Sequence, residues 1–379
     1  MEIGQMIDMQ PFFDAVKVVV DKHKLERPAE YRRWLWQDEE KGRSLGLNEY
    51  GCADAANILY TIGEFPRDMS EREACIAVLQ GFQDADTGLF RETTHNEFHT
   101  TAHCIAALEL FDARPKHALA AFAELKTKAN LERFLRCLDW IHDPWHEAHK
   151  GAGLYTSLVL SGEVDVEWQD WYFQWLWDEA DPETGLWRRG HEKRKYGRER
   201  AAPLFHHLAG SFHYLFVHEY AHRPLRYPER VVDSCLRIYR DRTSHAFRHA
   251  CSERHAQIMA NVPSDHPILL PATGSTSHSN PELGHDIGFA EIDWIYCLHR
   301  SCRQSGHRFE ECRNTLMGFA AEYLQYLGEE VDVNSNDRFN DLHWLFGAVC
   351  AVAELQQALP GLIRTEKPLR LVLDRRPFI

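Results

Sequence analysis

The chain has 379 residues, with 57 acidic and 43 basic side chains, so its net charge is −14 with histidine neutral. This acidic balance argues against nucleic acid as a partner, because a polyanion would be repelled. Hydrophobic residues make up 44% of the chain, which excludes a disordered protein and allows a large core. Protonation of all 23 histidines would change the net charge from −14 to +9, so the positions of the histidines matter near pH 6.

No apolar run approaches the roughly 20 residues that a membrane helix needs, and residues 1–10 lack the features of an export signal. We therefore expect a cytoplasmic protein without a membrane partner. The ten cysteines include no Cys-x-x-Cys pair and mostly lie in apolar helical patterns, which favours free thiols in a reducing compartment.

Almost every apolar stretch has helical spacing, which predicts an all-α protein. Six segments are rich in small residues and apolar on nearly all sides, which is typical of buried inner helices. In chain order they are Tyr50–Ile62, Phe98–Phe111, Gly151–Leu160, Leu204–Tyr220, Gly288–Arg300 and Phe339–Leu355. The amphipathic segments between them predict outer helices, and these are Ser70–Gln80, Asp165–Trp177, Pro228–Arg240 and Arg308–Leu327.

Inner and outer segments alternate with a nearly regular period, which predicts an array of helical hairpins. Six hairpins can close into a ring, so we expect one domain over residues 1–379. A longer gap before the fifth inner segment contains residues 244–285, with many Pro, Gly and Ser residues in its second half. We expect this insertion to be a loop or lid at the rim of a central cavity, with a packed surface excursion as the alternative.

Two turns between an outer and an inner segment share a motif, DADTGLF at 84–90 and DPETGLW at 181–187. Their acidic residue and Thr favour a tight turn, and their Gly tolerates positive φ. They resemble the DxxTGLW turns of unsaturated glucuronyl and rhamnogalacturonyl hydrolases. The pattern of the whole chain resembles the (α/α)6 toroid of six-hairpin glycosidases and several polysaccharide lyases, and the related toroids of terpene cyclases and protein prenyltransferases.

The resemblance implies an enzyme that cleaves a glycosidic bond, by hydrolysis or β-elimination, in a small and possibly uronate-containing glycoside. One alternative is an isoprenoid-handling toroid, whose zinc ligands would be Asp293, Cys297 and His343. Another is a toroid that binds a ligand without catalysis. The sequence does not predict an oligomeric state.

In a closed ring the N-terminal ends of the inner helices converge on one cavity, which is the expected site. His95, His99 and His103 recur at every fourth residue, with Glu97 among them, and share one face if the helix extends back to His95. This spacing can bind zinc, but no further ligand follows from the sequence. We therefore expect no cofactor, with zinc as the alternative.

Buried acidic and histidine residues are the expected catalytic groups. Asp54 and Glu291 lie inside apolar stretches, where a charge is costly unless it is paired or functional. Hydrolysis needs two carboxyl groups about 5 to 9 Å apart, so Asp54 or Glu291 would act with Asp341. An N-terminal cap or an internal ion pair is the alternative role.

For β-elimination at a uronate, His207 or His99 would be the base and Tyr155 the acid, with Asn340 or an arginine neutralising the carboxylate. The residues expected to bind the substrate are His95, Glu97, His103, Trp145, Lys150, Arg189, His206, Asp286, Asn340 and His343.

Overall fold

The computed structural model describes residues 6–36, 45–191, 202–241, 287–329 and 339–379. Helices are the main regular structure of these ranges, which confirms the predicted all-α class. The strands β1 (Ile7–Asp8) and β2 (Ile363–Arg364) form a short parallel pair. No helix within these ranges is long and apolar enough to cross a membrane. The predicted insertion at 244–285 and the predicted substrate-binding residue Asp286 lie outside the described residues.

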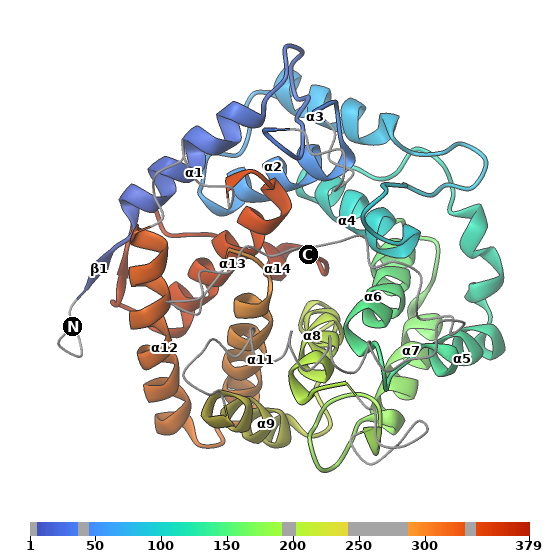
Figure 1. The fold of residues 1–379 in the computed structure, drawn as a ribbon. Helices are drawn as coiled ribbons and strands as arrows, with labels where there is room; N and C mark the ends of the chain where they lie inside the picture. Colours follow the sequence, from blue (N-terminus) through green and yellow to red (C-terminus); the bar gives the residue numbers. More distant parts are fainter. Residues whose placement is uncertain (1–5, 37–44, 192–201, 242–286, 330–338) are drawn as a thin grey trace.

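Six helices correspond to the six predicted inner segments and are largely buried. They are α2 (Glu49–Thr61), α4 (Glu97–Leu110), α6 (Pro144–Leu160), α8 (Leu204–Tyr220), α11 (Ala290–Ser305) and α13 (Leu342–Ala358). Each contacts the next in this order, and α13 contacts α2, so the series of contacts closes on itself. Figure 1 shows these helices inside the others.

A second set of helices alternates with the inner ones along the chain and lies at the periphery in Figure 1. It consists of α1 (Gln10–His23), α3 (Met69–Gly81), α5 (Lys128–Cys137), α7 (Val166–Glu179), α9 (Pro228–Asp241) and α12 (Phe309–Glu329). Most of these bridge two inner helices, as α3 does between α2 and α4, and α12 between α11 and α13. The short helix η1 (Ala120–Lys126) packs against α5.

Side-chain caps define where several inner helices begin. Asn48 accepts hydrogen bonds from the amides of Tyr50 and Gly51 at the start of α2. Asn96 caps α4 by accepting from the His99 amide. Asp341 caps α13 in the same way. These caps satisfy amides that a helix leaves unpaired, and they hold the polar ends of the inner helices in place.

The two predicted turns have the expected conformation. Gly88 and Gly185 have φ of 77° and 75°. Asp84 accepts hydrogen bonds from the amide and hydroxyl of Thr87, at 2.7 and 2.6 Å. A Cβ at Gly88 would lie 2.0 Å from the Ala118 carbonyl oxygen, so this position requires glycine for space as well as for φ.

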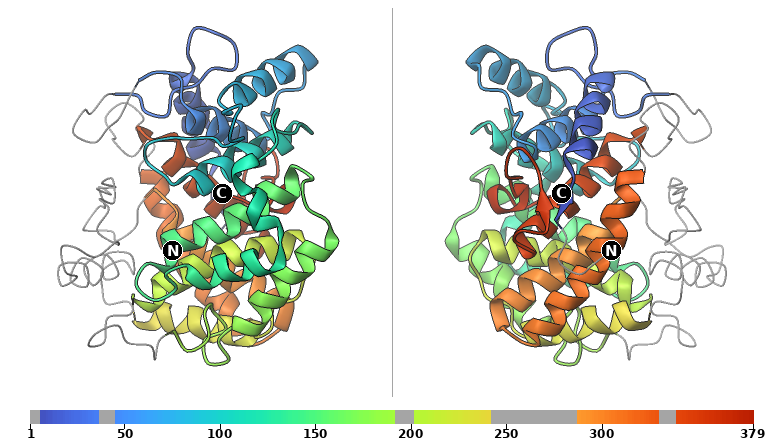
Figure 2. Two further views of the ribbon diagram at one scale, coloured as in Figure 1. Left: turned by 90° about the vertical axis from the view of Figure 1, so that its right-hand side faces the viewer. Right: turned by 90° about the vertical axis from the view of Figure 1, so that its left-hand side faces the viewer.

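The C-terminal residues lie inside the molecule, which the sequence did not predict. After α14 (Val372–Arg375), Phe378 and Ile379 are buried, and the end of the chain is central in both Figure 1 and Figure 2. The Thr156 hydroxyl of α6 donates to the Pro377 carbonyl oxygen at 2.6 Å. The Phe378 ring lies 4.9 Å from the His99 ring, so this segment fills the space between the inner helices.

Candidate functional site

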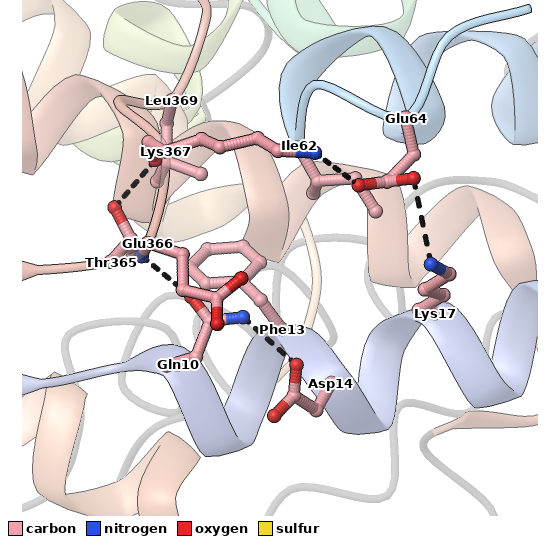
Figure 3. Close-up of a pocket in the computed structure, with 10 residues that line it drawn as sticks. All are labelled: Gln10, Phe13, Asp14, Lys17, Ile62, Glu64, Thr365, Glu366, Lys367 and Leu369. Atoms are coloured by element: carbon pink, nitrogen blue, oxygen red, sulfur yellow. Dashed lines mark hydrogen bonds and ion pairs between the residues drawn. The ribbon is translucent and has the colours of Figure 1, made fainter.

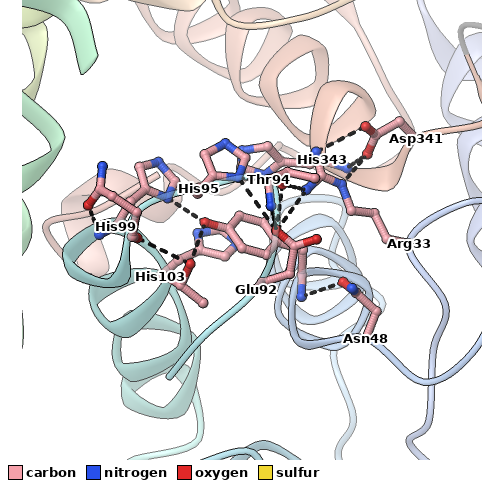
Figure 4. A network of polar contacts seen from close by, with 12 residues as sticks. Arg33, Asn48, Glu92, Thr94, His95, His99, His103, Asp341 and His343 are labelled. Carbon is pink, nitrogen blue, oxygen red and sulfur yellow. Dashed lines mark hydrogen bonds and ion pairs between the residues drawn. The ribbon is translucent and has the colours of Figure 1, made fainter. Parts of the chain in front are cut away.

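The N-terminal parts of α2, α4 and α13 bring four histidines together, and these are His95, His99, His103 and His343 (Figure 4). Their rings surround that of Tyr50. The Tyr50 ring centroid lies 4.7 Å from that of His95, 4.8 Å from that of His103 and 4.7 Å from that of His343. The helix begins at Glu97, so His95 lies just before it rather than within it. Its ring nevertheless stacks on His99 at 4.5 Å, as their spacing predicts.

Asp54 connects two of these histidines. It accepts from His103 Nε2 at 2.8 Å and from His343 Nδ1 at 3.2 Å, and its side chain is fully buried. Burial would raise the pKa of Asp54, but His343 and His103 lower it well below its usual range. An ionised carboxylate only accepts hydrogen bonds, so each ring carries its proton on the nitrogen that faces Asp54.

Arg33 organises the other side of the cluster. Its guanidinium donates twice to Asp341, at 2.8 and 3.0 Å, and once to the Thr94 hydroxyl at 2.6 Å. Thr94 donates to Glu92 at 2.5 Å and therefore accepts from Nδ1 of His95 at 2.8 Å. Burial raises the pKa of Glu92, but the nearby His95 ring and the charge of Arg33 lower it to about 2. His95 is thus held through Nδ1.

His99 is also held through Nδ1, which lies 2.5 Å from the Tyr50 hydroxyl oxygen. That oxygen is 3.4 Å from the Thr100 hydroxyl. Burial raises the pKa of Tyr50 well above its usual value, so the phenol stays protonated. Burial also lowers the pKa of His95 to about 3 and that of His99 well below its usual value. Both imidazoles are therefore neutral at neutral pH.

Two sets of side chains in this cluster have the spacing of metal ligands. One ligand atom from each of His95, His99 and His343 lies within 4.8 Å of the others, and the same holds for Asp54, His103 and His343. In the first set each Nδ1 atom has a protein partner, which is the Thr94 hydroxyl for His95, the Tyr50 hydroxyl for His99 and the Asp54 carboxylate for His343. Metal-binding histidines in proteins are usually held in this way through their second nitrogen.

The first set is therefore the better candidate metal centre. Three imidazoles suit Zn²⁺ and leave a fourth coordination position for water or substrate. A line of further rings extends from it, because His149 of α6 lies 4.5 Å from His99 and His213 of α8 lies 4.6 Å from His149. Burial lowers the pKa of His149 well below its usual value, so it too is neutral.

Several predicted site residues have other surroundings. Asn340 accepts from the amides of Leu35 and Trp36, so it positions the segment that carries Arg33. Glu97 is exposed and pairs with Arg91 at 3.2 Å. Lys150 pairs with Glu147.

Tyr155 is buried between α6 and α7, where its hydroxyl donates to Gln169 at 3.0 Å. Its neighbours there are aromatic rings, including Tyr172 at 4.8 Å. Glu291 is completely buried in α11. The structure does not place Tyr155 among the histidines around Tyr50.

A second group of predicted residues surrounds the start of α8. The His207 ring lies 4.0 Å from that of His191, and the Trp145 ring lies 5.6 Å from that of His206. Arg189 and His191 line a surface pocket with residues 138–141. The structure therefore separates the predicted histidines into two groups.

Sequence reasoning missed Arg33, Tyr50, Glu92 and Thr94. Tyr50 is the first residue of a predicted inner segment. Because the N-terminal ends of these segments were expected to converge on the cavity, its position indicated that it could lie at the site. Arg33, Glu92 and Thr94 lie in loops without periodicity, and nothing in their local sequence indicates that they contact one another.

A surface pocket near β2 has a different character (Figure 3). It lies between α1 and residues 365–369. Its charged groups pair with one another, because Glu64 binds Lys17 at 3.5 Å and Lys367 at 2.5 Å. These exposed pairs connect α1 and residues 365–369 to Glu64 and suggest no chemistry.

Comparison of the chain with protein-family models, curated proteins and solved structures found no match. The geometry of the site is therefore the basis for assigning a function to this chain.

Proposed function

We propose that the chain is a single (α/α)6 toroid and a metal-dependent enzyme, with Zn²⁺ bound by His95, His99 and His343. The closed series of contacts among six inner helices, with six outer helices alternating along the chain, supports the toroid. The observation that carries the metal site is the three-histidine set, whose ligand atoms lie within 4.8 Å of one another and in which each Nδ1 atom has a protein partner.

The proposed reaction is cleavage of a glycosidic bond in a small uronate-containing glycoside by β-elimination. Hydrolysis by two carboxyl groups fits less well, because Asp54 is held by two histidines and Asp341 by Arg33. The isoprenoid alternative also has less support. Its ligand set of Asp293, Cys297 and His343 is not among the metal-ligand groups found in the described residues.

Zn²⁺ held by His95, His99 and His343 would neutralise the carboxylate of the uronate and so make the proton on the adjacent carbon more acidic. His149, neutral and next to His99, takes that proton. A carbon–carbon double bond forms, the bond to the leaving sugar oxygen breaks, that oxygen takes up a proton from solvent, and His149 returns its proton to solvent. The products are an unsaturated uronate and the released sugar.

Metal analysis of the purified protein tests the site. We expect about one zinc per chain, lost in His343→Ala and His99→Ala and retained in the control His222→Asn, because His222 is exposed and at positive φ. Circular dichroism shows whether each variant is folded. Equal zinc content in folded His343→Ala and in the unmodified protein would refute the metal centre.

A panel of saturated and unsaturated uronic-acid disaccharides tests the reaction. We expect the absorbance of the unsaturated product to appear with one substrate, to be lost with a chelator and to return with Zn²⁺. A zinc-loaded protein that leaves every saturated uronide intact would contradict the reaction while leaving the metal site in place.

A further inference from the structure

Arg376 is a buried cation to which the described part of the chain offers no hydrogen bond. Its side chain is completely buried, and its three guanidinium nitrogens form no hydrogen bond with the described residues. It lies over the Phe346 ring at 5.6 Å, which is a cation–π contact. The adjacent Arg375, in contrast, pairs with Glu109 and Asp112 at 2.6 Å each. A buried cation without hydrogen bonds is unfavourable unless another group supplies them.

Two further buried side chains near Arg376 have unused polar atoms. Asn57 Oδ1 and Nδ2, and His103 Nδ1, have no hydrogen-bond partner in the described part of the chain. Arg376 interacts electrostatically with Asp54 and Tyr60, which lie three residues before and after Asn57 on α2. Residues at this spacing lie on the same broad side of a helix, and α14, which ends one residue before Arg376, contacts α2. The His103 ring lies 6.1 Å from the Phe346 ring, which is the same ring that Arg376 lies over.

We propose that Arg376, Asn57 and His103 form a buried binding site for a small oxyanion. The planar guanidinium matches two oxygens of a carboxylate or phosphate. Asn57 adds N–H donors and one acceptor. His103 offers an acceptor at Nδ1, because its Nε2–H is directed to Asp54.

Because the three side chains offer both donors and acceptors, they favour a ligand that can accept hydrogen bonds and also donate one. An oxyanion that retains a hydroxyl group, such as hydrogen phosphate, hydrogen carbonate or a hydroxy acid, satisfies the three side chains together. Chloride has no proton to donate and would leave His103 Nδ1 unsatisfied. The ligand is either a free inorganic anion or the carboxylate of a sugar acid, since both offer the same chemistry.

The site requires no metal, although Asp54 connects it to the histidine cluster by binding both His103 and His343. Binding of an oxyanion at this site is thus independent of the proposed zinc site. Repeating each measurement with a chelator distinguishes the two, because loss of zinc leaves the oxyanion response unchanged.

Thermal unfolding of the full chain in oxyanion-free buffer, titrated at constant ionic strength, tests the proposal. We expect a saturable rise in Tm with phosphate or hydrogen carbonate, or with glucuronate if the ligand is a sugar acid. Equilibrium dialysis should find about one bound oxyanion per chain. An equal rise with chloride, or no rise with any of them, would overturn the proposal.

Variants at Arg376 and Asn57 test whether the rise in Tm on adding oxyanion depends on these residues. Arg376→Met should abolish it without lowering Tm in oxyanion-free buffer, whereas the control Arg375→Met should keep it. Asn57→Asp places a carboxylate beside Arg376, so it should raise Tm in oxyanion-free buffer and weaken oxyanion binding at least tenfold. If Arg376→Met fails to fold, Asn57→Asp decides the matter. An unchanged oxyanion response in Asn57→Asp would contradict the site.

Discussion

Asp54 is ionised although it is completely buried, because His103 and His343 both donate to it. Its charge therefore serves to orient two imidazoles. In the proposed metal centre it is the partner that keeps the Nδ1 proton on His343 and leaves Nε2 for the metal.

Replacing Asp54 with Asn should weaken zinc binding about 10- to 100-fold, since an amide accepts at only one atom and no longer holds both rings. Competition with a chromophoric chelator measures this affinity. Asp139→Asn is the matched control, because Asp139 binds His142 at 2.9 Å away from the cluster. Unchanged zinc affinity in Asp54→Asn would show that Asp54 does not orient a metal ligand.

Much of this site follows from the sequence. The four-residue spacing of His95, His99 and His103 predicts their shared face, and the apolar context of Asp54 indicates that it is paired or functional. The contact of His343 with Asp54 does not follow, because 289 residues separate them and only packing of α13 against α2 joins them. Arg33 cannot be predicted for the same reason.

The inner helices approach one another at glycines. A Cβ at Gly153 of α6 would lie 2.6 Å from the Phe98 carbonyl oxygen of α4. A Cβ at Gly210 of α8 would lie 2.4 Å from the Pro144 carbonyl oxygen of α6. Both contacts are with backbone, which cannot move away as a flexible side chain can.

Gly153→Ala and Gly210→Ala should each lower the free energy of unfolding by about 1–3 kcal/mol, as overpacking does. This loss occurs although alanine is favoured over glycine within a helix by about 1 kcal/mol. Gly328→Ala in α12 is the control, because a Cβ there meets nothing within 4 Å, and it should be stabilising. Urea unfolding measures all three. A stabilised Gly153→Ala would show that α4 and α6 pack less closely than described.

The inner and outer helices can be distinguished in the sequence because their compositions differ. Small residues throughout the inner segments allow close packing and distinguish them from amphipathic α9 and α12. The burial of the C-terminal segment could not be predicted from the sequence, because residues 376–379 have no periodicity and their burial depends on the space that the inner helices leave.

At the scale of the whole molecule, buried neutral histidines make stability depend on pH. Burial lowers the pKa of His103, His213 and His218 to about 4 in the folded chain. In the unfolded chain each has its ordinary pKa near 6.5. Between these values the unfolded state binds more protons, so each group lowers stability as the pH falls from about 6.5 towards 4.

His218 isolates this effect, because it lies outside the candidate site. Its Nδ1 is 2.7 Å from the Tyr214 carbonyl oxygen, and its ring stacks on Trp187 at 5.3 Å. His218→Phe keeps the ring packing and removes the titration. The slope of unfolding free energy against pH between about 4 and 6.5 should therefore decrease by about 1.4 kcal/mol per pH unit relative to the unmodified protein. The exposed His222→Asn variant should keep the original slope. Parallel curves for His218→Phe and the unmodified protein would mean that His218 already titrates near its ordinary pKa when folded.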